Sequence, residues 1–186
     1  MAWIEQVEPG DADGLLADMY EQLEKKRGKV SNILKVHSLN PQALGDHLDL
    51  YMTIMFGKSG LSRAEREAIG VVVSAANNCA YCVNHHVEAL QRYVRDDEVI
   101  DVLRTAEGLD TLEPRLSCIT SHASKLTSAP SSVTDIDIDA LRGVGLDDRD
   151  ILDVSLITAY FNFVNRIALG LGVAFNPDEM TGYINE

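Results

Sequence analysis

Apolar residues recur at helical spacing along almost the whole chain. One such stripe, Leu15, Leu16, Met19 and Leu23, lies within residues 13–27, and residues 41–56 and 63–76 show the same pattern. Strand-like alternation of apolar and polar residues occurs only in residues 136–139, which are too few to build a sheet. The sequence therefore predicts an all-α fold.

Capping residues, prolines and glycines mark where these helices begin and end. Gly28 follows three basic residues and predicts the end of the first helix. Asn40 and Pro41 predict the start of the second, because Asn caps helices well and Pro is tolerated in the first turn. Ser62 and Glu65 have capping-box spacing, which predicts a helix to about residue 76. Further helices are expected near residues 98–106, 114–126, 137–142 and 151–173, with a linker at 128–132 and a short tail from 176.

Residues 61–90 and 146–175 share a pattern at an offset of 85 positions. Each segment begins with a leucine, two polar residues and a nearby acidic residue, and continues as an apolar run. We expect a degenerate helical repeat, with a cysteine-bearing copy at about 61–95 and a cysteine-free copy at about 146–175. N-terminal helices at about 1–57 would complete a single domain spanning 1–186. The alternative is that any two amphipathic helices align this well.

The charge composition narrows the classes of partner. The chain has 16 basic and 29 acidic residues, a net charge of −13, which leaves no basic stripe for nucleic acid or for an anionic membrane surface. No apolar run approaches the roughly 20 residues of a membrane span, and the first residues lack a signal-peptide pattern. We expect a soluble, cytoplasmic protein with no nucleic acid and no membrane as partner.

Residues 67–86 contain the densest group of redox-capable and proton-transferring side chains. Cys79 and Cys82 are three positions apart and His86 lies four beyond Cys82, so a helix would place all three on one face. In one unbroken helix Glu67 would lie about 22 Å from Cys82. The intervening residues 77–78 are both asparagine, a poor helix former, and predict a break. A chain reversal there would bring Glu67 to His86.

The predicted reversal would favour thiol chemistry in two ways. It would place both cysteines in the first turn of a new helix, where the helix dipole stabilises a thiolate. It would also let Glu67 fix the tautomer of His86 and make this ring a better proton acceptor. The competing interpretations are a zinc site made of Cys79, Cys82, His86 and either His85 or water, and inert burial of the cysteines. A second ligand pair of the kind that structural zinc sites use is absent from the sequence, so we expect no metal and no bound cofactor.

Other polar and titratable residues carry weaker signals. Cys118, the third cysteine, is expected to be a small core residue. His47 and Tyr51 are one helical turn apart and are candidate pocket residues, with ordinary packing as the alternative, whereas His37 and His122 have no notable neighbours in the sequence. Three polar residues, Asn162, Asn165 and Arg166, interrupt an apolar helix, and we expect them to form a structural ion pair or a subunit contact.

The spacing of Glu67, of the segment Cys79-Ala80-Tyr81-Cys82 and of His86 resembles the signature of the carboxymuconolactone decarboxylase and alkylhydroperoxidase D (AhpD)-like superfamily. Further similarity, at residues 32–34, 48–57 and 162–166, resembles a branch called uncharacterised peroxidase-related enzymes. The resemblance implies an AhpD-like all-α helical bundle with a duplicated core. It also implies a homo-oligomer, either a dimer, a trimer or a hexamer.

The same resemblance implies roles for the site residues. Cys82 would attack the peroxide, Cys79 would resolve the product as a disulfide, and Glu67 with His86 would relay protons. The implied partners are a small hydroperoxide substrate and an external dithiol reductant, either a protein or a small thiol. Tyr81 stands where the best-studied members have a histidine, and it is a third candidate pocket residue.

We therefore expect a thiol-dependent peroxidase-type oxidoreductase. One alternative is a redox-responsive sensor or scaffold protein whose cysteines cycle with little turnover, and another is a metal-binding module. A third is a lyase like carboxymuconolactone decarboxylase, with Glu67 and His86 as the acid–base pair. The decarboxylase members of the superfamily generally lack the cysteine pair, which argues against that third alternative.

Overall fold

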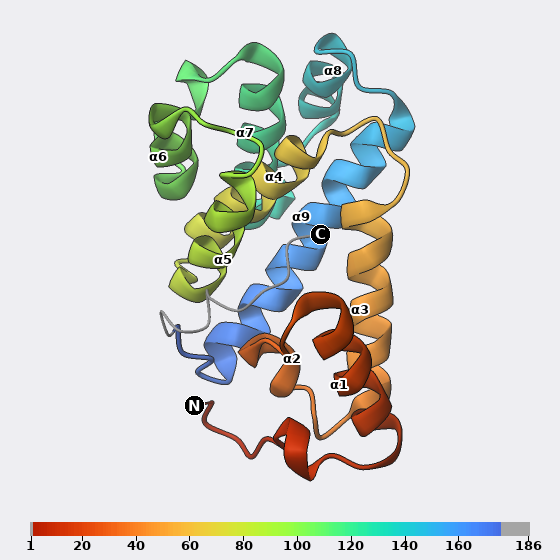
Figure 1. The fold of residues 1–186 in the computed structure, drawn as a ribbon. Coiled ribbons are helices and arrows are strands. Elements are labelled where there is room, and N and C mark those ends of the chain that lie inside the picture. The colour runs from red at the N-terminus through yellow and green to blue at the C-terminus, as the bar shows by residue number, and fades with distance from the viewer. Residues whose placement is uncertain (1, 176–186) are drawn as a thin grey trace. The chain divides into compact units, whose positions relative to one another are not determined.

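A computed structural model describes residues 2–175 of the protein, and these residues form an all-helical chain (Figure 1). The α-helices are α1 (Gly14–Arg27), α2 (Asn32–Lys35), α3 (Pro41–Phe56), α4 (Arg63–Ala76), α5 (Ala80–Leu90), α6 (Asp97–Thr105), α7 (Pro114–Ser128), α8 (Asp135–Gly143) and α9 (Asp148–Gly170). The 3-10 helices are η1 (Pro9–Asp11), η2 (Leu109–Thr111) and η3 (Pro130–Ser132). No strand occurs within residues 2–175, so the all-α prediction is confirmed.

The predicted helix boundaries agree with the structure wherever a capping signal was present. Gly28 ends α1 with a left-handed φ of 84°, and Ser62 and Glu65 form both hydrogen bonds of the capping box that starts α4. The alternating residues 136–139 lie inside α8, so their alternation does not reflect a strand. The short helix α2 was missed, and the tail predicted from residue 176 lies outside the described residues.

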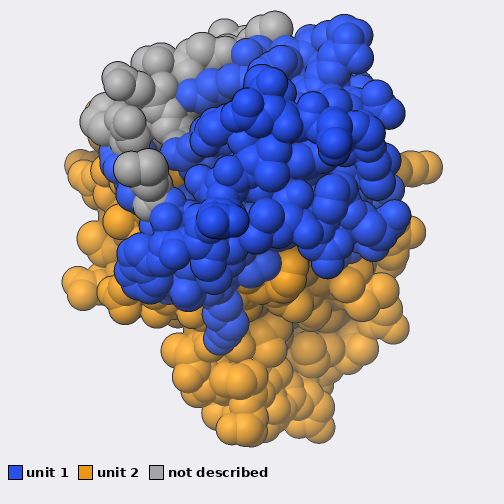
Figure 2. Space-filling model, turned by 90° about the horizontal axis from the view of Figure 1, so that it is seen from below, with its two compact units in different colours: residues 1–51, 166–186 blue, residues 52–165 orange. Residues whose placement is uncertain are grey.

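The chain divides into two compact units, residues 1–51 with 166–186 and residues 52–165, which Figure 2 colours separately. Unit 1 contains η1, α1, α2, most of α3 and the last turn of α9. Its core is a cluster of buried residues consisting of Leu16, Tyr20, Leu23, Val30, Leu34 and Leu44.

Unit 2 is built around α4, which packs against α5, α6 and α7. Residues 66–74 of this helix are all buried, which is typical of a helix surrounded by others. The buried Arg66 donates hydrogen bonds to the carbonyls of Met55 and Gly57 at the C-terminal end of α3, and to that of Leu61. Its charge therefore lies at the negative end of the α3 dipole.

The two copies of the expected repeat differ in their helical structure. Residues 61–90 form α4 and α5 with a chain reversal between them, whereas most of residues 146–175 form the single helix α9.

Among the helices of residues 2–175, none has both the length and the apolar content that a membrane span requires.

Candidate functional site

The chain reverses between α4 and α5 at the two asparagines. Asn77 ends α4 in a right-handed conformation, and Asn78 has a left-handed φ of 55°. Asn is one of the few residues other than glycine that adopts this conformation at low cost. Cys79 then forms the N-cap of α5, and its backbone N–H donates to the carbonyl of Ser74 at 2.9 Å. The predicted break is therefore present, and α5 runs back beside α4 (Figure 1).

The reversal brings the side chains of Glu67 and His86 into contact. The Nδ1 atom of His86 lies 2.8 Å from Oε2 of Glu67, whose residue has no exposed surface. The second carboxylate oxygen, Oε1, accepts a hydrogen bond from Nη2 of Arg63 at 2.6 Å. A carboxylate in this position fixes Nδ1 of the ring as the donor, so Nε2 is the nitrogen that can exchange a proton with a reactant.

Arg63 is held in place by more than its ion pair with Glu67. Its guanidinium stacks 3.9 Å from the centre of the Phe56 ring and donates a hydrogen bond to the carbonyl of Met55. Arg63 and Glu67 are four residues apart on α4, a spacing at which opposite charges meet on a helix. This pairing was missed at the sequence level although its signal was present. It supplies the counterion that a buried carboxylate needs.

A glycine allows the His86 ring to approach α4. A Cβ atom at Gly70 would lie 3.3 Å from Cγ of His86 and 2.9 Å from two ring carbons of Phe161. The His86 and Phe161 rings themselves meet edge to face, with centroids 4.5 Å apart. Any larger residue at position 70 would therefore displace one of these two rings.

Cys79 and Cys82 form a buried thiol pair. Their sulfur atoms are 2.8 Å apart, and the two residues are only 1% and 2% exposed. The sulfur–sulfur hydrogen bond lowers the pKa of the Cys79 thiol, against the opposing effect of burial. The same bond raises the pKa of Cys82, as do burial and the nearby charge of Cys79, whereas a hydrogen bond from the side chain of Asn165 lowers it.

The buried amide of Asn165 belongs to a polar network that sequence reasoning did not assemble. Its Nδ2 donates to Oγ of Ser74 at 3.1 Å, and its Oδ1 accepts from Nδ2 of Asn77 at 3.0 Å. Asn77 also donates to Oδ1 of Asn162, whose own amide donates to Oγ1 of Thr127 at 2.9 Å. The sequence showed polar residues interrupting an apolar helix, but it gave no indication of their partners.

The remaining candidate residues lie in varied surroundings. Tyr81 is 5% exposed and its ring is 4.5 Å from that of His85. Cys118 is half-buried.

His47 and Tyr51 lie on α3 in unit 1. Nδ1 of His47 is 3.2 Å from Nε2 of His37, and the Tyr51 ring faces Arg27. His37, for which the sequence indicated no notable neighbour, therefore has His47 as a contact. The role of His47 and Tyr51 in a pocket stays a prediction.

Metal binding would be an alternative use of the cysteines. Within the part of the chain that the structure describes, no group of three or more His, Cys, Asp or Glu residues is arranged to hold a metal ion. Cys79 and Cys82 instead contact each other, and His86 contacts Glu67.

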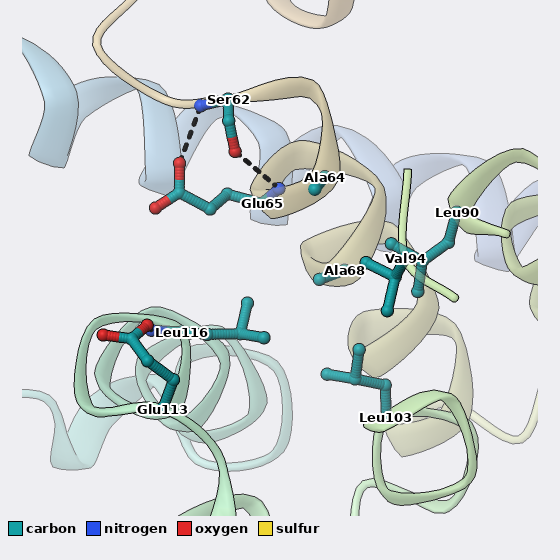
Figure 3. A pocket seen from close by; sticks show the side chains of 9 residues that line it. All are labelled: Ser62, Ala64, Glu65, Ala68, Leu90, Val94, Leu103, Glu113 and Leu116. Atoms are coloured by element: carbon teal, nitrogen blue, oxygen red, sulfur yellow. Dashed lines mark hydrogen bonds between the residues drawn. The ribbon is translucent and has the colours of Figure 1, made fainter. Parts of the chain in front are cut away.

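Figure 3 shows a pocket of about 400 Å³ at the start of α4. Its lining residues are Ser62, Ala64, Glu65, Ala68, Leu90, Val94, Leu103, Glu113 and Leu116. The two oxygens of Glu65 accept hydrogen bonds from the Ser62 backbone and the Arg115 side chain. Those of Glu113 cap α7 by accepting from two backbone N–H groups. These carboxylates therefore serve local structure, and the two thiols are not among the lining residues.

Comparison with known proteins identifies the family of the chain. Residues 41–112 match the carboxymuconolactone decarboxylase family. The crystal structure of an uncharacterized peroxidase-related protein from Silicibacter sp. TM1040 is 31% identical and has a TM-score of 0.85, with 97% of this chain and 94% of that chain covered. The chain belongs to the carboxymuconolactone decarboxylase and AhpD-like superfamily.

Two further solved structures extend the comparison within the AhpD-like fold. The AhpD core structure of an uncharacterized peroxidase-related protein from Ralstonia eutropha JMP134 is 28% identical, with 100% of this chain and 98% of that chain covered and a TM-score of 0.86. The debrominase Bmp8 shares the fold at 18% identity, with 94% of this chain and 96% of that chain covered and a TM-score of 0.77.

Proposed function

We propose that this protein is a thiol-dependent peroxidase-type oxidoreductase that reduces small hydroperoxides through a dithiol/disulfide cycle. The observation that carries the proposal is the pair of sulfur atoms 2.8 Å apart at the start of the helix that also bears His86. Peroxide reduction by two thiols needs a nucleophilic sulfur, a second sulfur within reach and a group that supplies a proton. The described residues provide all three types of group.

In the proposed first step, Cys82 gives its proton to His86, against the Cys79 contact and the burial that raise the pKa of Cys82, and the resulting thiolate attacks the distal oxygen of ROOH. A sulfur–oxygen bond forms as the oxygen–oxygen bond breaks, and the leaving alkoxide takes a proton delivered through His86 to give ROH. Glu67, buried and hydrogen-bonded to Nδ1 of His86, stabilises the ring while it holds and transfers that proton. Cys82 is then a sulfenic acid.

In the second step, Cys79 attacks the sulfur of this sulfenic acid. A disulfide forms and the hydroxyl leaves with a proton as water, which protects Cys82 from further oxidation. A disulfide requires sulfur atoms about 2.05 Å apart, so the pair has to approach by less than about 1 Å. An external dithiol then reduces the bridge by exchange through a mixed disulfide, and both thiols are restored.

The burial of both sulfur atoms favours one second candidate function. Residues with 1% and 2% of their surface exposed meet peroxide slowly unless the site opens. A redox-responsive sensor that oxidises once and returns slowly to the dithiol would tolerate such burial, whereas a rapid peroxidase would not. Turnover under excess reductant therefore separates the two functions.

The test measures peroxide consumption by the reduced protein with dithiothreitol as the dithiol. We expect turnover that is abolished in Cys82→Ser and in Cys79→Ser, while the Cys118→Ser control keeps the wild-type rate. Glu67→Gln should lower the rate by about 10²-fold, because general acid–base assistance contributes at least this much. Equal rates in the wild type and Cys82→Ser would refute the peroxidase, and stoichiometric oxidation without turnover would identify the sensor.

We also propose that the protein is a homo-oligomer. Three apolar side chains on α9 are well exposed: Leu152 at 52%, Leu156 at 40% and Phe163 at 48%. Their spacing of four and seven residues places them on one face of the helix. Large apolar side chains exposed on one helix face are typical of an interaction site.

A further inference from the structure

Arg63 links the pair of Glu67 and His86 to the C-terminal end of α3. Its Nη2 atom donates to Oε1 of Glu67 at 2.6 Å, and its Nη1 atom donates to the backbone carbonyl of Met55. Its guanidinium also stacks on the Phe56 ring, 3.9 Å from the ring centre. A guanidinium is rigid and planar, so three contacts in different directions fix both its position and its plane. The cation is therefore held in one place beside Glu67.

Solvent does not replace this cation at Glu67. Only 1% of the Glu67 side chain is exposed, and the residue lies within the buried stretch 66–74 of α4. A carboxylate taken out of water is costly unless a cation and hydrogen bonds accompany it. Arg63 supplies the cation at one oxygen, and His86 occupies the other at 2.8 Å. The charge on Glu67 thus depends on the residue four positions before it.

Packing holds the His86 ring in one orientation. A Cβ atom at Gly70 of α4 would lie 3.3 Å from Cγ of His86, and the ring of Phe161 on α9 meets the imidazole edge to face at 4.5 Å. Nδ1 therefore stays at Glu67, and the open question is where the protons lie. An ionised carboxylate can only accept a hydrogen bond, which places a proton on Nδ1 and leaves Nε2 of the neutral ring unprotonated.

Without the cation, a proton would neutralise the buried charge in one of two ways. The Glu67 carboxyl can take the proton and donate to Nδ1, in which case the ring proton moves to Nε2. The ring can instead take the proton and become an imidazolium, which is protonated at both nitrogens. Both outcomes leave Nε2 of His86 unable to accept a proton.

We propose that Arg63 is a positioning residue that keeps Glu67 an ionised acceptor and thereby keeps Nε2 of His86 free to take a proton. This role rests on the proposed thiol chemistry, in which His86 accepts a proton from Cys82 and later delivers it. It adds to that chemistry the residue that decides which ring nitrogen is the acceptor. Arg63 acts through Glu67 and not on the reactants.

The other groups around the His86 ring do not take this role. Arg66, on the same turn of α4 as Arg63, donates to backbone carbonyls at the end of α3. Cys82 lies one turn before His86 on α5, and a thiol there adds no positive charge. Phe161, the contact from α9, is uncharged. Replacing Arg63 therefore tests the charge of the carboxylate without removing either partner of the hydrogen bond.

The test locates the protons on His86 by nitrogen-15 NMR of protein labelled in its histidine rings, at pH 7.5. The signals are assigned by their loss in His86→Gln, and the chemical shift of each ring nitrogen reports whether it is protonated. In the wild type we expect an unprotonated Nε2. In Arg63→Met, which keeps a side chain that packs on Phe56, the ratio of unprotonated to protonated Nε2 should fall by about tenfold or more, the factor that a hydrogen bond to a charged group contributes.

Two further variants separate the charge from local structure. Arg115→Met removes another arginine that forms an ion pair of 2.6 Å with a glutamate of α4, in this case Glu65, and it should leave the Nε2 signal as in the wild type. Arg63→Lys restores a cation four residues before Glu67 and should restore most of the unprotonated Nε2.

Two results would overturn this role of Arg63. The first is a wild-type ring that is protonated at Nε2 at pH 7.5, a result that needs no variant and no folding control. The second is an Nε2 signal in folded Arg63→Met, as judged by circular dichroism, equal to that of the wild type. Because the NMR measurement involves no peroxide, absence of peroxidase turnover would refute the proposed function without affecting it.

Discussion

At the residue scale, Gly70 is as important to the site as its ionisable groups. We expect Gly70→Ala to lower the free energy of unfolding by about 1–3 kcal/mol, because its Cβ would lie 2.9 Å from the buried Phe161 ring. Alanine also has a higher helix propensity than glycine, by about 1 kcal/mol, which offsets part of this loss. Peroxide turnover should also fall, since the His86 ring is the other neighbour. Urea denaturation and the peroxide assay measure the two effects.

The matched control is Gly143→Ala at the end of α8. A Cβ atom there meets nothing within 4 Å, so the same substitution should leave stability and turnover unchanged or raise stability slightly. Equal stability of both variants would show that the close approach at Gly70 is not needed.

A second residue-scale prediction concerns His47 in unit 1. Burial, together with the charges of His37 and Arg27, lowers the pKa of His47 from 6.5 to about 4. Above pH 6.5 the ring is neutral in both the folded and the unfolded state. Between pH 6.5 and 4 the unfolded state binds more protons, so stability falls as the pH falls, by about 1 kcal/mol at pH 5.5.

His47→Gln should remove this contribution. We expect the loss of unfolding free energy between pH 7.5 and 5.5 to be about 1 kcal/mol smaller in the variant than in the wild type, as measured by urea denaturation. The comparison cancels the contributions of the many carboxylates, which are common to both proteins. An identical pH dependence of the two proteins would contradict the shifted titration of His47.

At the scale of elements, the reversal between α4 and α5 depends on Asn78. Its left-handed φ of 55° is costly for residues with a Cβ other than Asn and Asp, by roughly 1–2 kcal/mol. We expect Asn78→Ala to lower the free energy of unfolding by about 1 kcal/mol, whereas Asn78→Gly should leave it unchanged or raise it. Chemical denaturation of the three proteins measures the order. An alanine variant as stable as the glycine variant would contradict the role given to this conformation.

The two segments of the expected repeat contribute different residues to the site. The first copy folds into α4 and α5 and carries the thiols, His86 and Glu67, whereas the second forms α9 and carries Asn162 and Asn165. Asn77 and Asn162 are 85 positions apart, the offset of the sequence pattern, and they are hydrogen-bonded to each other. Asn162 and Asn165 therefore join α9 to the end of α4 by hydrogen bonds. The ion pair or subunit contact expected for this polar group stays a prediction.

At the scale of the whole molecule, the exposed apolar face of α9 predicts self-association. We expect the wild type to sediment as a multiple of 20.4 kDa and the double variant Leu152→Glu, Leu156→Glu to shift toward the monomer, because buried unpaired carboxylates are costly. The matched control is Ile136→Glu on α8, which replaces a side chain that is 76% exposed. Analytical ultracentrifugation decides the matter: a monomeric wild type, or a control that dissociates equally, would contradict the prediction.

The sequence alone predicted the helical class, most helix boundaries and the contact between Glu67 and His86. These features follow from signals that act over a few residues, namely apolar periodicity, the capping box at Ser62 and the poor helix formers before Cys79. The pairing of Arg63 with Glu67 was equally readable, since the two residues are four apart on one helix.

The tertiary structure alone decided which partners the buried polar residues find. Asn165 is 91 positions from Ser74, and the packing of α9 in unit 2 places its amide there. The need for a glycine at position 70 of α4 likewise depends on Phe161, which lies on α9, the helix that also carries Asn165. Local patterns determine where helices form because hydrogen bonds and caps are made within a turn. Contacts between distant helices depend on how whole side-chain surfaces fit together, and that information is not local in the sequence.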